Sequence, residues 1–170
     1  MLKRLVPAIA ALLLVSPLRA QTTPRDTLLA RMIGHWVLRG TIAHQQVIHD
    51  VTFDWVLGSE YVEMHEISRE RTPAGTPAYE AIVYIGHDLH TNEYSALWLD
   101  NTAYGAFDPA GVGRGAAVAD SIPLLFTYSK TSRFHTTFVY SQSSDSWEWH
   151  MDNDDEKGRR TFARVTLTRK

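Results

Sequence analysis

Beyond residue 34, apolar and polar residues alternate with a period of two along most of the chain. Segment 47–57 shows the pattern most clearly, because every second position is apolar except His49. Alternation of this kind predicts a β-strand that buries one face. The apolar members of that face are Val47, Val51, Phe53, Trp55 and Leu57.

The same pattern recurs in short segments that are separated by residues typical of turns. No helical stripe interrupts them, which argues against an α/β fold with crossover helices. We therefore predict an all-β fold, an antiparallel up-and-down β-barrel of about ten strands, with a β-sandwich as the alternative. Segment 111–120 is rich in glycine and alanine and should form a weak or edge strand. The expected strands are 36–42, 47–57, 61–67, 79–86, 93–100, 102–107, 111–120, 122–130, 133–140, 146–152 and 161–169.

A short helix should precede the first strand. Leu28, Leu29, Met32 and Ile33 recur at helical spacing, and Gly34 follows them directly. Glycine after the last apolar position of such a stripe is typical of a helix end.

The turn at 58–59 predicts how the second and third strands pair. A two-residue hairpin of Gly and Ser would place Phe53 opposite Met64. In that register His49 and Glu66 share the inner face, one diagonal step apart. A slip of one residue would turn both outward.

Residues 1–20 have the plan of a secretory signal peptide. A basic start is followed by an apolar run over 5–15, and the small Ala20 precedes the polar Gln21. The run is about half of the roughly 20 residues that span a bilayer, so we expect cleavage rather than retention. No cysteine follows to carry a lipid. The expected product is a single domain, 21–170, that is secreted or periplasmic and has no membrane anchor.

Charge and cysteine content narrow the possible partners. Without Lys3, Arg4 and Arg19, the 17 basic residues fall to 14 against 19 acidic ones, a formal charge of about −5. No basic patch indicates nucleic-acid binding. The chain has no cysteine, so its stability in an oxidising compartment must come from the core alone.

Gly34-His35-Trp36, at the start of an all-β chain of this length, resembles the opening of the calycins, the lipocalins and their relatives. The resemblance implies that Trp36 closes one end of the barrel and that a basic side chain of the last strand packs across it. Arg169 is the first candidate for that role and Arg164 the second. Gly34, Trp36 and Arg169 are then structural residues, and ligand chemistry belongs towards the other end.

A second stretch resembles a family of secreted bacterial lipocalin-like proteins that has no established reaction. Its pattern is Gly-Tyr-Asp, a turn, then Tyr and Trp-x-Asp, matched by Gly86-His87-Asp88, Tyr94 and Trp98-Leu99-Asp100. His87 stands where the family has tyrosine. The resemblance covers roughly residues 27–170 and implies fold and secretion rather than a reaction.

A barrel of this size is either filled by side chains or wide enough for one small ligand. We favour a cavity that binds a small hydrophobic or amphipathic molecule, because polar residues on apolar faces are costly unless something pairs with them. A filled interior, with His49 and Glu66 solvated at the rim, is the alternative. The expected lining residues are His49, Phe53, Trp55, Met64, Glu66, Trp98, Asp100, Phe138, Trp147, Trp149 and Arg164.

Other functions stay open. A carboxylate beside an imidazole could act as an acid–base pair, which makes a barrel-based enzyme using Glu66 and His49 the first alternative. Asp100 could orient a ligand or cap a turn. A non-catalytic interaction protein, using the weak segment 111–120 as an exposed edge, is another possibility.

We expect no cofactor and no metal site. The chain has eight histidines, but none lies in a recognisable metal-ligand spacing. The most specific metal-binding alternative is a haem-binding barrel, in which His150 would be the candidate haem ligand. His150 alternates with Trp147, Trp149 and Met151, however, and should therefore point outward.

Overall fold

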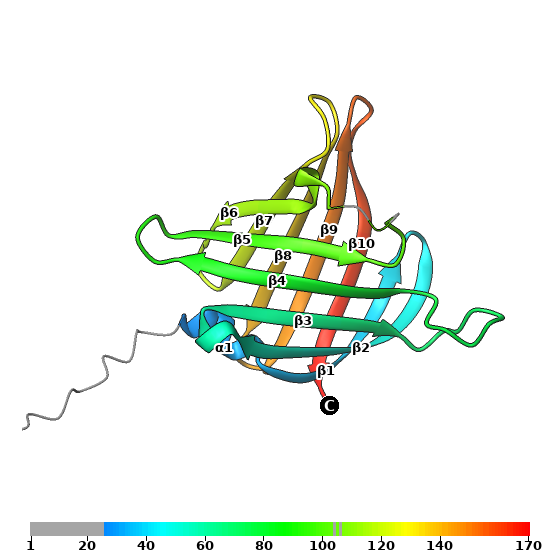
Figure 1. The fold of residues 1–170 in the computed structure, drawn as a ribbon, viewed down its shortest axis with the longest axis horizontal. Helices are drawn as coiled ribbons and strands as arrows, with labels where there is room; N and C mark the ends of the chain where they lie inside the picture. The colour runs from blue at the N-terminus through cyan, green and yellow to red at the C-terminus, as the bar shows by residue number, and fades with distance from the viewer. Residues whose placement is uncertain (1–25, 104, 106) are drawn as a thin grey trace, which may run out of the picture.

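The computed structural model describes residues 26–103, 105 and 107–170, and it shows an antiparallel barrel of ten strands (Figure 1). Each strand pairs with its neighbours in the chain, and β1 pairs with β10 to close the barrel. The expected signal peptide, residues 1–20, lies outside the described residues. The elements are α1 (Thr27–Met32), β1 (Gly34–Ile42), β2 (Gln45–Val56), η1 (Leu57–Ser59), β3 (Tyr61–Ser68), β4 (Glu80–Asp88), β5 (Glu93–Asp100), η2 (Pro109–Gly111), β6 (Val112–Ala116), β7 (Ser121–Thr127), β8 (Arg133–Ser141), β9 (Ser146–Asp155) and β10 (Gly158–Arg169).

The structure confirms the up-and-down barrel and excludes the sandwich. It also confirms the short helix, whose first turn is capped by Asp26: its Oδ1 accepts a hydrogen bond of 2.6 Å from the Leu29 amide. One expected strand is missing, because the described residues of 102–107 form turn and loop. No helix in the described part of the chain is long and apolar enough to cross a membrane.

The predicted register of β2 and β3 is confirmed, although the turn between them differs from the prediction. Phe53 lies opposite Met64, and His49 lies opposite Ser68. The connection is a 3₁₀ turn over Leu57–Ser59 in which all three residues have positive φ, rather than a two-residue hairpin. Register survives because the alternation of the strands, not the turn, decides which residues are buried.

The weak strand is also confirmed. Segment β6 is only five residues long, and its pairing with β7 is reduced to Arg114 opposite Leu125. Glycines explain the close approach of these strands, since a Cβ at Gly115 would lie 2.1 Å from the Pro123 carbonyl oxygen. Of all neighbouring strands in the barrel, β6 and β7 therefore have the fewest paired residues.

One end of the barrel is closed by α1 and Trp36. The Trp36 side chain is fully buried, and its Nε1 donates a hydrogen bond of 2.6 Å to the Met32 carbonyl. The guanidinium of Arg169 lies over the indole, with Cζ 4.0 Å from the ring centroid, and donates to the Ile33 carbonyl at 2.6 Å. The packing of Arg169 across Trp36 is therefore confirmed.

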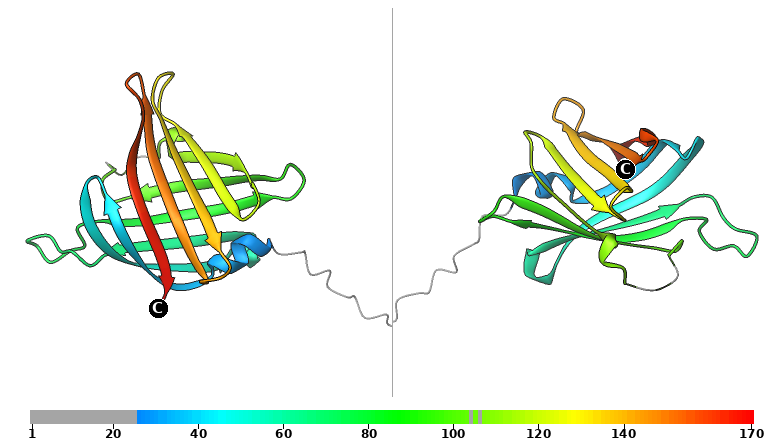
Figure 2. Two further views of the ribbon diagram at one scale, coloured as in Figure 1. Left: turned by 180° about the vertical axis from the view of Figure 1, so that it is seen from behind. Right: turned by 90° about the horizontal axis from the view of Figure 1, so that it is seen from above.

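Gly34 allows this closure. Its φ is +124°, and a Cβ there would lie 2.7 Å from the Arg169 Nη1 atom. A larger residue would be strained and would displace the guanidinium. Figure 2 shows α1 at one end of the barrel and the β9–β10 hairpin at the other.

Large apolar side chains fill the half of the barrel next to this closed end. Phe138 stacks on Trp149 with ring centroids 4.5 Å apart, and Trp147 meets Phe138 edge-on. The Trp149 Nε1 donates to the hydroxyl of Thr136, whereas the buried Trp147 Nε1 has no hydrogen-bond partner among the described residues. Fully or almost fully buried residues of this half include Phe53, Met64, Phe138, Trp147 and Trp149.

Candidate functional site

A cavity of about 860 Å³ occupies the open end of the barrel. Its wall is formed by the open ends of the strands and by the loops that join β1 to β2, β3 to β4 and β5 to β6. The volume lies in the range of sites for small molecules, about 300–1,000 Å³. Residues of eight of the ten strands and of the connecting loops line it, including Val47, His49, Glu66, Ser68, Tyr79, Trp98, Asp100, Phe126, Phe134, Met151 and Phe162.

The cavity ends at a layer of side chains that contains both polar and apolar groups. Towards the closed end, the next inward-facing residues of β2, β3 and β9 are Val51, Met64 and Trp149. All three are buried and do not line the cavity. His49 and Glu66 therefore form part of its floor.

His49 and Glu66 are a buried polar pair at this floor. The His49 side chain is 5% exposed and the Glu66 side chain 2%. The His49 Nδ1 and Glu66 Oε1 atoms are 2.5 Å apart, a short hydrogen bond across β2 and β3. The other ring nitrogen, Nε2, has no hydrogen bond to any described residue. It is the atom of this pair that could exchange a hydrogen bond or a proton with a molecule in the cavity.

Tyr79 covers the pair from the β3–β4 side. Its ring stacks on His49 with centroids 5.9 Å apart, and its hydroxyl accepts a hydrogen bond of 3.2 Å from the Trp98 Nε1. Burial, followed by the negative charges of Glu66 and Asp100, raises the pKa of Tyr79 far above its usual value. The phenol therefore keeps its proton under all physiological conditions.

Asp100 caps a turn and also lines the cavity. Its Oδ1 accepts hydrogen bonds from the Thr102 amide at 2.8 Å, the Thr102 hydroxyl at 2.6 Å and the Ala103 amide at 3.1 Å. These bonds hold the loop that follows β5. The carboxylate faces the cavity as well, so both roles expected for this residue are compatible.

Aromatic rings form the remaining wall. The Trp98 ring meets Phe126 edge-on, with centroids 6.3 Å apart, and lies tilted against Trp149 at 5.7 Å, which links the cavity to the packed core below. Phe134 contacts both Phe126 and Phe162. Such edge-to-face contacts fix ring positions, so the wall is preformed.

Four of the eleven expected lining residues line this cavity: His49, Glu66, Trp98 and Asp100. Six others face the interior but lie nearer the closed end. Five of them belong to the packed core, and Trp55 is half-buried against it. These six are Phe53, Trp55, Met64, Phe138, Trp147 and Trp149.

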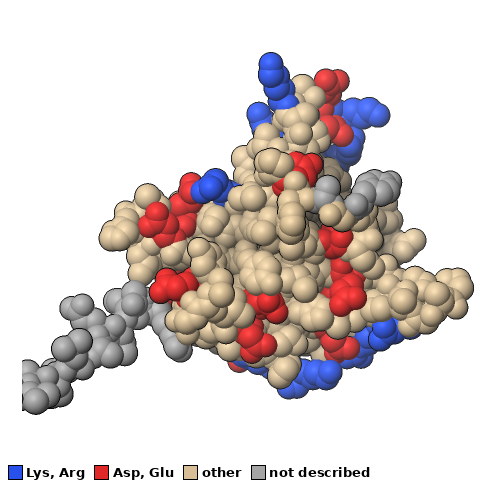
Figure 3. Space-filling view, viewed as in Figure 1, with Lys and Arg blue, Asp and Glu red and all other residues tan. Residues whose placement is uncertain are grey.

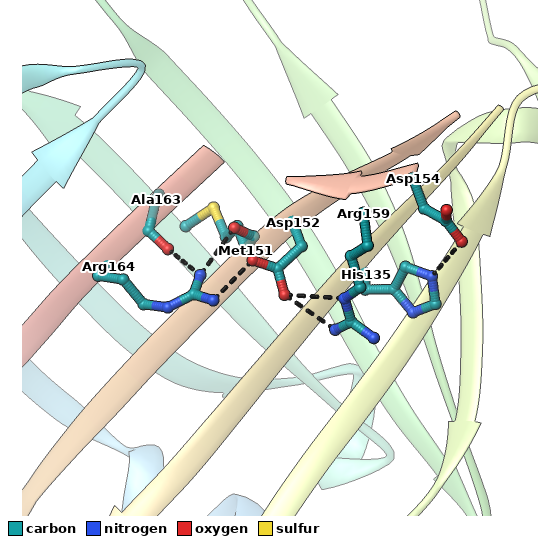
Figure 4. A network of polar contacts seen from close by, with 7 residues as sticks. All are labelled: His135, Met151, Asp152, Asp154, Arg159, Ala163 and Arg164. Atoms are coloured by element: carbon teal, nitrogen blue, oxygen red, sulfur yellow. Dashed lines mark hydrogen bonds and ion pairs between the residues drawn. The ribbon is translucent and has the colours of Figure 1, made fainter. Parts of the chain in front are cut away.

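The expected inward position of Arg164 is wrong. Its side chain lies on the outer surface, where Nη2 donates to the Asp152 carboxylate at 2.6 Å and Nη1 to the Met151 carbonyl at 2.9 Å (Figure 4). The reason is a shift of register between Thr161 and Ala163. After this bulge the buried positions of β10 are the odd-numbered ones, and Arg164 is exposed.

Asp152, Arg159 and Arg164 form a network of charged side chains on the outer surface, called the outer network below. Asp152 is buried beneath two arginines, Arg159 and Arg164, which both donate to its carboxylate. Burial alone would raise the pKa of Asp152, but the two guanidiniums together hold it below its usual value. His135 pairs with Asp154 beside them (Figure 4).

Tyr79, Phe126 and Phe162 were not among the expected lining residues. Tyr79 could have been found, since it continues the alternation of Ala81 and Val83 back to the residue that precedes β4. Phe162 could not, because the bulge places it and Ala163 on the interior side together.

The described residues contain no group of three His, Cys, Asp or Glu side chains that could hold a metal ion. His150, the candidate haem ligand, is 39% exposed on the outer face, where Nε2 lies 3.1 Å from a carboxylate oxygen of Glu148. It therefore points outward as expected and takes no part in the cavity.

A search of protein-family models gives no match to this chain, and a search of curated proteins gives no significant match either.

Proposed function

We propose that this protein is an exported, calycin-like barrel that binds one small amphipathic molecule in the cavity at its open end. One observation carries the proposal: an apolar cavity of about 860 Å³ has a buried polar pair, His49 and Glu66, at its floor. A purely structural barrel has no need of such a pair, because buried polar groups cost stability.

The two parts of the cavity suit the two parts of such a ligand. Burial of an apolar body against Trp98, Phe126 and Phe162 would contribute about 25 cal/mol per Å². The floor would fix the orientation of the polar end. Because the rings already pack on one another, little ordering is needed when the ligand binds.

Two further features support the relation to calycins and export. The closed end has the Trp36–Arg169 arrangement that the resemblance implies. The pattern of residues 1–20 is that of a secretory signal.

A fluorescence titration tests the proposal. N-Phenyl-1-naphthylamine is neutral and apolar, and its emission increases when it leaves water. We expect saturable binding to the wild-type protein with a stoichiometry of one. Val47→Trp, which fills the cavity from β2, should weaken binding by about tenfold or more.

The matched control is Ile48→Trp, the next residue on the same strand, which is 43% exposed on the outer face. It should leave binding unchanged. Equal effects of the two substitutions, or no saturable binding to the wild type, would contradict the proposal.

A further inference from the structure

The charged side chains that line the cavity are almost all acidic. Among its described lining residues are four carboxylates, Glu66, Glu70, Asp100 and Asp108, and no lysine or arginine. His49 can supply at most one positive charge. The lining is therefore net negative whether His49 is neutral or protonated.

The floor offers acceptors rather than donors. Glu66 is 1% exposed, and only its Oε1 has a hydrogen-bond partner among the described residues, leaving Oε2 free. If His49 donates its Nδ1 proton to Glu66, then Nε2 is a second free acceptor. Glu66 lines the cavity, where a further donor or a positive charge would stabilise its carboxylate.

The surrounding wall suits a positive charge. Tyr79 and Trp98 flank the acidic floor, and both present an aromatic ring to the cavity. The faces of aromatic rings attract cations, most strongly where water is excluded. The same rings provide an apolar surface for the rest of a ligand.

The outer surface has a matching distribution of charge. Over the wall formed by β3, β4 and β5, Figure 3 shows carboxylates spread across the face, whereas lysines and arginines lie mainly at its margins. A negative surface around a negative cavity raises the local concentration of cations and lowers that of anions.

Resting on the proposed binding function, we infer that the ligand is an amphipathic organic cation. Its ammonium or amidinium head donates hydrogen bonds to Glu66 Oε2 and His49 Nε2, and its apolar or aromatic body lies against Trp98 and Phe126. Donors on the head satisfy the unused acceptors, and its charge offsets that of the buried carboxylate.

Three probes with the same ten-carbon chain test this inference: decylammonium, 1-decanol and decanoate. Isothermal titration calorimetry of the wild-type protein at pH 7.5, below the micelle concentration of each probe, gives their relative affinities. We expect decylammonium to bind about tenfold or more tightly than decanol, and decanoate to bind most weakly. This ranking needs no variant.

Glu66→Gln removes the charge and keeps the shape. It should reduce the preference for decylammonium over decanol by about tenfold while decanol affinity changes little. Glu63→Gln is the matched control, since Glu63 is on the same strand but does not line the cavity. That variant should keep the wild-type preference.

The outcomes separate the two proposals. If decanol and decanoate bind as tightly as decylammonium, the cation inference is overturned and cavity binding stands. If the preference is the same in Glu66→Gln and Glu63→Gln, the assigned head-group position is wrong. If no decyl probe binds, the proposed function itself fails.

Discussion

At the scale of single residues, Arg169 holds the closed end together. Its guanidinium covers Trp36, donates to the carbonyls of Ile33 and Arg31, and pairs with Asp145. We expect Arg169→Ala to lower the free energy of unfolding by about 2–3 kcal/mol, because a cation–π contact and charge-assisted hydrogen bonds are lost together. Urea unfolding measures the change.

The neighbouring residue gives the control. Lys170 makes one exposed ion pair, with Asp50 at 3.1 Å, and exposed pairs contribute about 0–1 kcal/mol. Lys170→Ala should therefore cost much less than Arg169→Ala. Equal losses would show that Arg169 does not hold the end closed.

Single residues also show what could be predicted from sequence. Trp36 and Arg169 could be paired because a closed meander brings its first and last strands together. His49 and Glu66 could be paired because alternation fixes the register of β2 and β3. Arg164 was placed on the wrong face although Ala163, Val165 and Leu167 alternate with Arg164 and Thr166, a pattern that puts Arg164 on the polar side of β10.

At the scale of elements, the pairing of β1 with β10 closes the wall. Gly40 is at this seam, with φ +150°, and a Cβ there would lie 2.3 Å from the Arg164 carbonyl oxygen. Gly40→Ala must push two backbones apart. We expect it to cost about 3 kcal/mol or more in the free energy of unfolding, measured by urea titration.

Gly75→Ala controls for backbone strain alone. Gly75 also has a positive φ, +83°, but a Cβ there would have no neighbour within 4 Å. The cost should be about 1–2 kcal/mol. If both variants lose the same stability, close approach of β1 and β10 is not what requires glycine at 40.

The outer network ties β9 to β10 and should make stability depend on pH. The pKa of Asp152 is lowered in the folded protein, so its contribution is complete above the unfolded pKa of about 4 and is lost as pH falls through the folded pKa. Asp152→Asn should lower the free energy of unfolding at pH 7 by about 2 kcal/mol. In urea titrations between pH 7 and pH 2, the difference in free energy of unfolding between the wild type and Asp152→Asn should shrink as the pH falls.

Asp54, which is exposed on β2, provides the comparison. Asp54→Asn should leave stability within about 0.5 kcal/mol of the wild type over the same range. If the loss of unfolding free energy in Asp152→Asn stays constant down to pH 2, the ionised carboxylate does not contribute to stability.

At the scale of the whole molecule, the barrel divides into a packed half and an open half. The packed half was predictable as an apolar interior, but its aromatic residues could not be assigned to core or cavity from sequence. Trp147 and Trp149 fill the core, whereas Trp98 reaches the cavity. The difference lies in how far each residue is from the closed end, which depends on strand tilt and loop conformation.

The five tryptophans make this division measurable. Trp98 lines the cavity, and Trp36 is buried at the closed end behind α1. In ¹⁵N-labelled protein each indole N–H gives its own NMR signal. Titration with N-phenyl-1-naphthylamine should shift the Trp98 signal saturably and leave the Trp36 signal in place. A Trp98 signal that does not move, or a Trp36 signal that moves as far, would contradict a binding site at the open end.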